Sequence, residues 1–285
     1  MKINFTKMHG IGNDYIYVDC RNGLDFDPCR LSILMSPRHF SVGADGLVLI
    51  CESDVADAKM RMFNADGSEG KMCGNAIRCV GKFLYDNGIV KKDEISIETL
   101  SGIKYLKLKA ENGKVRYVTV DMGFADFTPE KIPVINNEPM IDKPVTVNTP
   151  SGVYNVNLTA VSMGNPHAVC YVDSIDDIDL QKIGPSFENL SIFPERVNTE
   201  FVKVENETTL SMRVWERGSG ETFACGTGAC AVVASSVKNG ICRPDTDVTV
   251  KLIGGELIIN CSSDMRITMT GKAEKAYEGV YECED

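Results

Sequence analysis

Two cysteines occupy a sequence context in which a thiol could act as an acid or a base. Cys73 lies in MCGNAIRC and Cys225 in ACGTGACA, each just before a glycine and a polar residue at a predicted helix start. The N-terminal end of a helix carries partial positive charge and unpaired N–H groups, which favour a thiolate and can hold a carboxylate. Gly74 and Gly226 would let the backbone approach a ligand closely.

The two cysteines belong to a longer internal repeat. EGKMCGNAIRCVGKFLYDNG (69–88) aligns without gaps on ETFACGTGACAVVASSVKNG (221–240), at an offset of 152 positions. The pair Gly12-Asn13 recurs at the same offset as Gly164-Asn165. Several matches in one order indicate two homologous halves, each of ordinary domain size.

Prolines mark a boundary between these halves. The stretch 126–145 holds four of the eleven prolines and is expected to be an edge strand or a linker, because proline cannot donate to a sheet. We predict an N-terminal half over 1–125, completed by 272–285, and a C-terminal half over 126–271.

Both halves follow one predicted plan. Short strands rich in β-branched and aromatic residues precede the Cys-Gly turn, and a helix with an apolar stripe follows it. Each helix ends at Asn-Gly, a common C-terminal stop, and further strands such as EISIETL (94–100) and VTVKLI (248–253) come next. The pattern predicts an α+β fold of two similar units.

Duplication of a thiol at a helix start suits one reaction in particular. If the two starts faced one carbon next to a carboxylate, one thiolate could remove a proton while the opposite thiol supplied one. The helix ends would stabilise the charge that forms on the substrate. The expected chemistry is therefore inversion at an α-carbon, with Cys73 and Cys225 as the acid and base.

Composition excludes several other classes of protein. The net charge is −10 and basic residues form no block, which argues against nucleic acid and anionic membranes as partners. No uncharged apolar run reaches the roughly 18 residues of a membrane helix, and the segment MKINFTKMHG reads as a strand, so we expect a cytosolic protein. The basic segment 104–117 is expected to be a hairpin around an Asn-Gly turn.

The remaining cysteines are expected to be structural. Eleven cysteines without an export signal favour reduced thiols over a disulfide framework, and their spacing with only three histidines makes a zinc site improbable. Cysteine is among the most buried residue types. The members expected in the core are Cys20, Cys51, Cys79, Cys170, Cys230 and Cys261.

Five segments together resemble the diaminopimelate epimerases. They occur in the expected order and span nearly the whole chain: FTKMHGIGNDYIYVD (5–19), MRMFNADGSEGKMCGNAIRC (60–79), MGNPHAVCYV (163–172), FPERVNTEFV (193–202) and WERGSGETFACGTGACA (215–231). The resemblance implies inversion of LL-diaminopimelate to the meso form without pyridoxal phosphate or another cofactor, in lysine and cell-wall precursor synthesis. It also implies two pseudo-symmetric halves, each a β-barrel-like sheet around a central helix, in a cytoplasmic homodimer.

The resemblance assigns roles to residues of this chain. Cys73 and Cys225 would be the acid and base, with His167 and Glu216 beside them to set their protonation. The residues implied in substrate binding are Asn13, Asn64, Gly74, Asn75, Asn165, Asn198, Glu216, Arg217, Gly226 and Thr227. An arginine fork suits the distal carboxylate of diaminopimelate. Some members carry Gln within the segment that reads GADG (43–46) here, and Gly46 has no side chain to offer a ligand.

Other functions stay open at this point. Proline racemases and hydroxyproline epimerases are similar in fold and paired cysteines but take a substrate without the distal zwitterion, so Asn64, Asn198 and Arg217 separate the two. A thiol redox protein would oxidise Cys73 with Cys225, although the chain lacks the C-x-x-C spacing usual for that role. A non-catalytic amino-acid binding protein would give no reason for two thiols at helix starts.

Overall fold

The protein, described here from a computed structural model, consists of two compact units. The structure describes residues 2–23 and 25–282. The first unit comprises residues 1–121 and 270–285, and the second comprises residues 122–269. Strands β8 (Lys114–Phe124) and β17 (Arg266–Lys272) carry the chain from one unit to the other.

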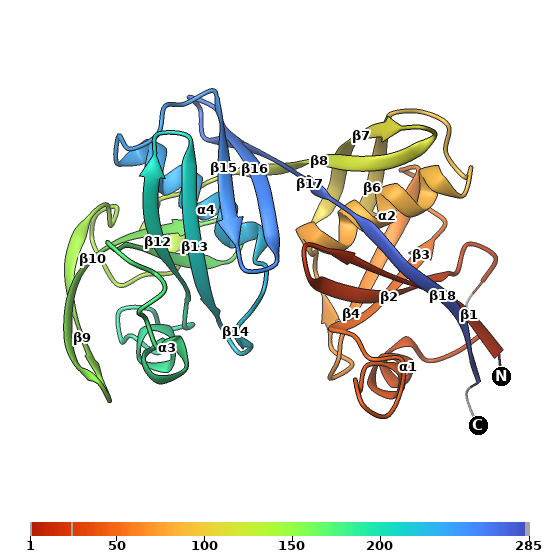
Figure 1. Ribbon diagram of the computed structural model, residues 1–285, viewed down its shortest axis with the longest axis horizontal. Coiled ribbons are helices and arrows are strands. Elements are labelled where there is room, and N and C mark those ends of the chain that lie inside the picture. Colours follow the sequence, from red (N-terminus) through yellow and green to blue (C-terminus); the bar gives the residue numbers. More distant parts are fainter. Residues whose placement is uncertain (1, 24, 283–285) are drawn as a thin grey trace. The chain divides into compact units, whose positions relative to one another are not determined.

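The first unit is mainly β-structure around one long helix, α2 (Gly74–Asp86) (Figure 1). A shorter helix, α1 (Pro28–Met35), follows the first two strands, and Asp27 caps it by accepting from the Cys29 N–H. Besides β8, the strands are β1 (Lys2–Gly10), β2 (Asn13–Asp19), β3 (Gly46–Cys51), β4 (Ala58–Asn64), β5 (Glu69–Gly70), β6 (Glu94–Thr99), β7 (Gly102–Glu111) and β18 (Glu274–Glu282).

The second unit repeats this arrangement around helix α4 (Gly226–Lys238). Its shorter helices are α3 (Leu180–Glu188) and the 3₁₀ turn η1 (Pro129–Lys131). Besides β17, its strands are β9 (Lys143–Thr149), β10 (Gly152–Ser162), β11 (Pro166–Tyr171), β12 (Asn198–Asn206), β13 (Thr209–Glu216), β14 (Gly220–Glu221), β15 (Thr246–Leu252) and β16 (Gly255–Cys261).

Strand pairing follows the same topology in both units. In the first, β2 pairs with β3 in parallel, β4 pairs with β5 antiparallel, and β4 also pairs with β6 in parallel. In the second, β11–β12, β13–β14 and β13–β15 pair in the same three ways. Tyr15 lies opposite Gly46 as His167 lies opposite Asn198, so these pairs keep the offset of 152. The internal repeat therefore extends from sequence to strand register.

The two units differ in which part of the chain supplies the strand beside β1 or its equivalent, β10. β1 pairs with β18 at the C-terminal side of the sequence, and the two run side by side in Figure 1. The equivalent strand β10 pairs instead with β9, which immediately precedes it. In the first unit the strand that pairs with β1 therefore comes from the C-terminal part of the chain. In the second unit the strand that pairs with β10 comes from the N-terminal part of that unit.

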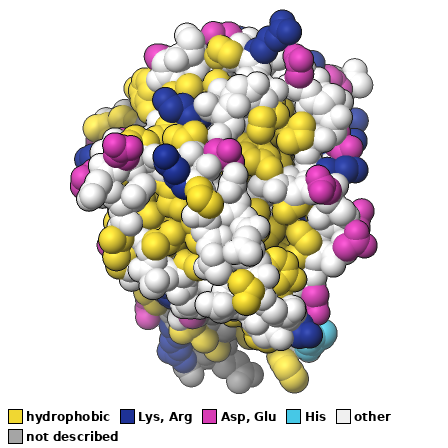
Figure 2. All heavy atoms as spheres, turned by 90° about the vertical axis from the view of Figure 1, so that its left-hand side faces the viewer, with side chains coloured by type: hydrophobic (Ala, Val, Ile, Leu, Met, Phe, Trp, Pro, Cys, Tyr) yellow, Lys and Arg dark blue, Asp and Glu magenta, His cyan; other side chains and the backbone are white. Residues whose placement is uncertain are grey.

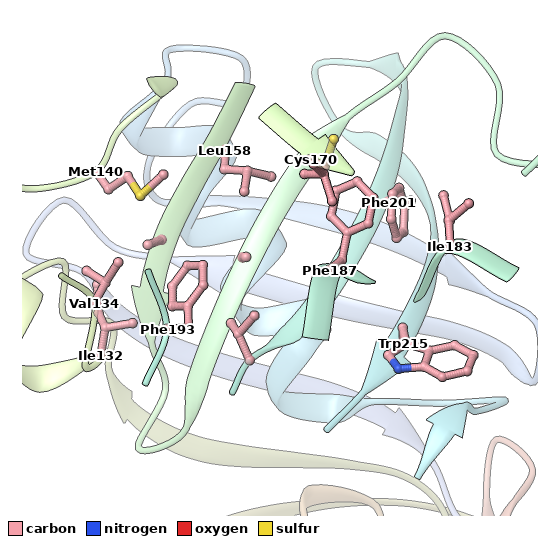
Figure 3. Packing of buried hydrophobic residues seen from close by; sticks show 14 of the residues in the cluster. Ile132, Val134, Met140, Leu158, Cys170, Ile183, Phe187, Phe193, Phe201 and Trp215 are labelled. Carbon is pink, nitrogen blue, oxygen red and sulfur yellow. The ribbon is translucent and has the colours of Figure 1, made fainter. Parts of the chain in front are cut away.

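Each unit buries an apolar cluster beneath its shorter helix. In the second unit the ring of Phe187 on α3 packs edge-on against Phe201 on β12, with centroids 5.0 Å apart, among Leu158, Cys170 and Trp215 (Figure 3). The first unit packs residues of α1 against β1, β2 and β3 in the same way. The long helices are largely buried as well, and on α2 the apolar stripe that the sequence predicts consists of Ile77, Val80 and Leu84.

The proline-rich stretch differs from its prediction in part. Pro144 lies in β9, a strand that pairs with β10, and several residues before β9 pack into the core of the second unit. Ile132, Val134 and Met140 are buried in the cluster of the second unit, because their side chains are large and apolar enough to complete it. Sequence composition alone did not reveal that this stretch belongs to the core.

The face that includes β9 and β10 is shown in Figure 2. Apolar side chains are distributed across it between uncharged groups, and most acidic side chains lie toward its edges. Exposed apolar residues near these strands include Ile135 and Val153. Single exposed apolar side chains are normal on soluble proteins, and these carry no functional argument.

Local predictions from sequence are confirmed in several places. β7 and β8 form the expected hairpin, with Asn112 and Gly113 at positive φ in the turn. The strands expected at 94–100 and 248–253 are β6 and β15. Among residues 2–23 and 25–282, none of the helices has both the length and the apolarity to cross a membrane.

Candidate active site

Both predicted catalytic cysteines are the N-cap residues of the long helices. The Cys73 backbone is extended (φ −132°, ψ 122°), and its Sγ accepts a hydrogen bond from the Ala76 N–H at 3.5 Å. Cys225 has a similar backbone (φ −112°, ψ 105°), and its Sγ accepts from the Gly228 N–H at 3.3 Å. Each sulfur therefore takes the place of the usual capping oxygen and lies at the positive end of its helix.

The start of α4 is packed too closely for a side chain at its third residue. A Cβ on Gly228 would lie 2.8 Å from Glu200 Oε1 and 3.1 Å from Cys225 Sγ. Glycine thus allows the helix backbone to come against both the sulfur and the carboxyl group. The equivalent residue of α2 is Ala76, which is also buried. This position of α2 therefore accommodates a methyl group that α4 excludes.

In the first unit the Cys73 sulfur faces an amide side chain. Cys73 Sγ donates to Asn13 Oδ1 at 3.4 Å, while Asn13 Nδ2 donates to Asp45 Oδ2 at 2.8 Å. Arg38 donates to both Asp14 and Asp45 at 2.7 Å, which ties the start of β2 to the loop before β3. The resulting chain of contacts runs from an exposed guanidinium to the thiol.

A buried guanidinium holds the first turn of α2 from behind. Arg78 has no exposed surface, and it donates to Gly74 O at 3.0 Å and to Asn75 Oδ1 at 2.9 Å. A Cβ on Gly10 would lie 2.9 Å from Arg78 Nη2, so a glycine there makes room for the charge. Asn75 is itself buried, and its side chain is held by Arg78 while its backbone stays in the first turn.

In the second unit Cys225 is buried among acidic groups. Burial raises its pKa well above the usual value, and the negative charges of Glu216 and Glu200 raise it further. The Thr227 hydroxyl, 3.6 Å from Sγ, and the Gly228 N–H act in the opposite direction. Burial and the two acidic neighbours therefore disfavour the thiolate form of Cys225.

Glu216 shares the environment of Cys225. Burial raises the pKa of its carboxyl group, against hydrogen bonds from the Thr222 hydroxyl and the Cys225 thiol. Thr222 Oγ1 donates to Glu216 Oε1 at 2.5 Å. The carboxyl group of Glu216 therefore lies within hydrogen-bonding reach of the Cys225 thiol.

His167 joins the same site through a line of hydrogen bonds. Its Nδ1 lies 2.6 Å from Glu200 Oε1 and its Nε2 lies 3.0 Å from Asn165 Oδ1. Asn165 Nδ2 donates in turn to the Thr227 hydroxyl at 3.3 Å. His167 and Glu200 are both fully buried, so their positions are fixed by packing as well as by these bonds.

Three of the other residues implied in substrate binding form hydrogen bonds to backbone groups or to a loop side chain. Asn198 is buried, donates to Pro166 O at 3.0 Å and accepts from the Arg217 N–H at 2.8 Å, so its amide positions Arg217. The guanidinium of Arg217 donates to Glu195 O at 2.8 Å from an exposed position. In the first unit, Asn64 donates to Ser68 Oγ at 2.9 Å.

Close packing explains the glycine found at position 46. A Cβ on Gly46 would lie 2.0 Å from Phe63 O and 3.0 Å from the ring of Tyr15. A glutamine there would require the strands β3 and β4 to separate, so this position contributes only backbone to its surroundings.

Three residues near the sulfurs were missed by sequence reasoning. Asp45 directly precedes Gly46, Arg78 lies in MCGNAIRC, and Glu200 lies in the buried first part of β12, between Thr199 and Phe201. A charged residue inside a buried strand is uncommon unless it is paired, and that is the signal that could have identified Glu200. Asp45 gave no comparable signal, because its partner Asn13 is 32 positions away in the sequence.

Residues 2–23 and 25–282 contain no group of three or more His, Cys, Asp or Glu side chains arranged to hold a metal ion. Ten cysteines of that part of the chain are free thiols, and Cys283 lies outside the described residues. Five of the six cysteines predicted in the core are buried, whereas Cys51 is only partly buried.

Comparison with known sequences identifies close relatives of this chain. The family model described as diaminopimelate epimerase matches residues 5–128 and 159–276. A protein named diaminopimelate epimerase from Methanococcus maripaludis strain C5 is 54% identical over 97% of this chain and 99% of its own length. A protein of the same name from Acetivibrio thermocellus is 53% identical over 97% of this chain and 98% of its own.

Solved structures with low sequence identity share the fold. A phenazine biosynthesis protein of the PhzF family from Bacillus anthracis aligns over 99% of this chain and 100% of its own, with a TM-score of 0.72 and 18% identity. A hydroxyproline epimerase from Agrobacterium vitis, with bound trans-4-hydroxy-L-proline, aligns over 98% and 92% with a TM-score of 0.71 and 15% identity. These likenesses confirm the predicted α+β fold of two similar halves.

Proposed function

The chain belongs to the diaminopimelate epimerase family, and on that premise we propose that it interconverts LL- and meso-diaminopimelate without a cofactor. The observation that carries the proposal is the duplicated helix start, with Cys73 and Cys225 as N-caps of α2 and α4. A reaction that inverts a stereocentre needs a proton acceptor on one side and a donor on the other. Two equivalent thiols meet that need with groups of one chemical type.

In the proposed mechanism the halves 1–125 with 272–285 and 126–271 act as two domains, and each supplies one of the two cysteines. The thiolate of one cysteine takes the α-hydrogen as a proton, which leaves the electron pair on the α-carbon and carboxylate. The thiol of the other cysteine then delivers its proton to the opposite face, and the two sulfurs exchange protonation states. The next turnover begins after the protons redistribute through solvent.

The helix starts supply the stabilisation of the carbanionic intermediate. Backbone N–H groups of Gly74, Asn75, Gly226 and Thr227 would bind the α-carboxylate, where negative charge increases during the reaction. These groups point along the helix axes from fixed positions, so they need not reorganise when the charge forms. This role explains why each sulfur lies directly beside a glycine.

The distal end of the substrate is assigned to the polar residues around the helix starts. Arg217 would bind the distal carboxylate, with Asn13, Asn64, Asn165 and Asn198 reading its amino and carboxylate groups. Asn198 supports this assignment by holding the Arg217 backbone at 2.8 Å. His167 and Glu216 would set the protonation of the Cys225 thiol.

The cellular setting follows from the same proposal. An epimerase for this substrate would serve lysine and cell-wall precursor synthesis in the cytoplasm, acting on a small molecule as a homodimer. The net charge of −10 gives no reason to expect nucleic acid or an anionic membrane as a partner.

Substrate competition tests this function. Purified protein is incubated with LL-diaminopimelate, L-proline or trans-4-hydroxy-L-proline, without pyridoxal phosphate, and the stereoisomers are separated by chiral chromatography. We expect inversion of LL-diaminopimelate alone, and Arg217→Ala should lower kcat/KM by about a hundredfold or more, as for loss of a charged bidentate contact. Preferential turnover of either proline substrate, or near-normal turnover by the Arg217 variant, would contradict the assignment.

A redox function is tested in the same preparation. An oxidant should abolish epimerisation if it joins Cys73 to Cys225, and a reductant should restore it. Catalysed thiol–disulfide exchange on other proteins, without epimerisation, would favour the redox alternative.

A further inference from the structure

We propose that Asp45 is a positioning residue for Cys73: its carboxylate fixes the Asn13 amide so that the amide oxygen, and not the amide nitrogen, faces the sulfur. All three residues belong to the first unit. The catalytic meaning of this arrangement rests on the proposed function, but the state of the thiol can be measured without substrate.

The orientation of an asparagine amide depends on its partners. One end of the group, Oδ1, only accepts hydrogen bonds, and the other end, Nδ2, only donates them. Asp45 Oδ2 lies 2.8 Å from one end of the Asn13 amide, and Cys73 Sγ lies 3.4 Å from the other. Since an ionised carboxylate can only accept, the end that faces Asp45 must be Nδ2, which leaves Oδ1 for the sulfur.

The other contacts of Asp45 agree with an ionised carboxylate. Its Oδ2 also accepts from the Asp14 N–H at 3.1 Å, and its Oδ1 accepts from Arg38 Nη2 at 2.7 Å. Every partner is therefore a donor. Burial and the nearby charge of Asp14 raise the pKa of Asp45, against these hydrogen bonds.

The charged cluster consists of Lys7, Asp14, Arg38 and Asp45, and it holds equal numbers of positive and negative charges. Burial would raise the pKa of Asp14, but hydrogen bonds from Arg38 and Lys7 lower it below its usual value. Lys7 is buried, with its Nζ 2.5 Å from Asp14 Oδ2, and it also donates to Gly43 O. Two cations thus accompany two carboxylates, which allows Asp45 to remain charged although it is partly buried.

Two buried titratable groups near Cys73, Tyr17 and Cys79, do not bring a charge to its sulfur. Burial raises the pKa of Tyr17, whose hydroxyl donates to Ala76 O at 3.3 Å, and it raises the pKa of Cys79 to about 11. Both groups are therefore protonated and neutral near pH 7. Asn13 contacts both the Cys73 sulfur and Asp45, and so links the charged side chains to the thiol.

The amide orientation has a direct consequence for the thiol. An oxygen acceptor stabilises the S–H form and repels a thiolate, whereas an N–H donor in the same place would stabilise the thiolate. Asp45 therefore biases Cys73 toward its protonated form. The equivalent amide of the second unit, Asn165, bonds to the Thr227 hydroxyl and to the His167 ring, so its partners differ from the carboxylate that holds Asn13.

The test is the pH dependence of alkylation at Cys73 in the full-length protein. Iodoacetamide labelling is followed by mass spectrometry of the peptide that contains Cys73, because other cysteines react as well. Asp45→Asn can donate to Asn13 Oδ1 and so turn the amide nitrogen toward the sulfur. We expect the midpoint of labelling to fall by about one pH unit, or about tenfold faster labelling at a fixed pH below the midpoint.

A second background separates amide orientation from simple loss of charge. Asp45→Asn also removes a negative charge, and that effect persists when Asn13→Ala is present. We expect the Asp45→Asn shift to shrink to less than half in the Asn13→Ala protein. Equal shifts in the two backgrounds, or no shift in either, would overturn the proposal.

Two further variants complete the experiment. Asn13→Ala alone removes the acceptor and should lower the Cys73 midpoint; a rise would show that the amide donates to the sulfur and would overturn the proposal even if no Asp45 variant folds. Arg38→Gln is the matched control, since it removes a partner of Asp45 but keeps the Asn13–Asp45 bond. Its Cys73 midpoint should stay unchanged or rise, and a fall equal to that of Asp45→Asn would also overturn the proposal.

Discussion

At the start of α2 the Cys73 sulfur meets the amide of Asn13, whereas at the start of α4 the Cys225 sulfur is buried beside Glu216 and Glu200. The helix geometry around the two sulfurs is nearly the same, and so is the pairing of the surrounding strands. Duplication has thus preserved the backbone that presents a thiol while the side chains around it have diverged. A reaction that needs one acid and one base benefits from that divergence, because identical environments would give the two thiols equal proton affinity.

The positions that differ are identifiable one by one. At the offset of 152, Glu216 corresponds to Asn64 and Glu200 corresponds to Val48, so both acidic neighbours of Cys225 have uncharged counterparts. In the other direction, the buried Arg78 corresponds to Cys230. The second unit therefore has more negative charge near its sulfur, and the first unit has a buried cation behind its helix start.

The largest expected effect concerns the sulfurs themselves. Cys73→Ala and Cys225→Ala should each lower the rate of epimerisation by about a hundredfold to ten-thousandfold, since each removes an acid–base group. Cys230→Ala, a buried cysteine on the same helix as Cys225, is the control and should keep most of the activity. If either helix-start variant kept the wild-type rate, the equivalence of the two regions in catalysis would be wrong.

Arg78 gives the next largest effect, on stability. Arg78→Met removes donors from Gly74 O, Asn75 Oδ1 and Lys272 O, and should lower the free energy of unfolding by about 3 kcal/mol because buried acceptors lose their partners. Urea denaturation measures the change. Cys230→Ala at the equivalent position should cost only about 1–2 kcal/mol, as a small cavity. Equal losses would show that the guanidinium has no special role in the first unit.

Glu216 sharpens the comparison through pH. Its negative charge raises the pKa of the Cys225 thiol, so Glu216→Gln should lower that pKa, by about one unit. Alkylation of the Cys225 peptide would then reach half its maximum at lower pH, while the Cys73 peptide should keep its midpoint. Glu205→Gln, an exposed glutamate of the same unit, serves as the control. A downward shift at Cys73 as large as that at Cys225 would contradict the separate environments.

The smallest effect concerns a duplicated ion pair. Arg61 pairs with Glu69 at 2.7 Å, and at the equivalent positions Arg213 pairs with Glu221 at 2.8 Å. Arg213 also donates to two backbone carbonyls, so Arg213→Gln should destabilise by about 1–2 kcal/mol and Arg61→Gln by less than about 1 kcal/mol. The two variants are compared by thermal denaturation. A larger loss of stability in Arg61→Gln than in Arg213→Gln would contradict this prediction.

The sequence predicted the fold and the paired cysteines because those features repeat. Gly12-Asn13, the Cys-Gly helix starts and the Asn-Gly stops recur at one offset, and local rules for caps and turns then place the helices. The stop is confirmed at both helices, where Asn87 and Asn239 cap the ends and Gly88 and Gly240 have positive φ. The substrate-binding roles remain predictions, since they depend on a ligand.

The side-chain network around each sulfur was beyond sequence reasoning for a physical reason. Asp45 reaches Asn13 across 32 positions, and His167 reaches Glu200 across 33, through parallel strand pairs whose register no local pattern reveals. The burial of residues within 126–145 could not be predicted for a similar reason. A proline-rich composition does not show whether the neighbouring apolar residues pack into a core. Contacts that depend on register and packing become visible only in the folded chain.

Solvent deuterium incorporation tests the central claim most directly, namely that two thiols act on opposite sides of one carbon. LL-diaminopimelate is converted in D2O to low extent, and both the meso product and the remaining substrate are analysed by mass spectrometry. The product should carry one deuterium at the inverted α-carbon while the recovered LL isomer stays unlabelled, because the group that removes the proton is not the group that returns it. Product that retains the original hydrogen, or recovered LL isomer labelled as fully as the product, would contradict the two-thiol account.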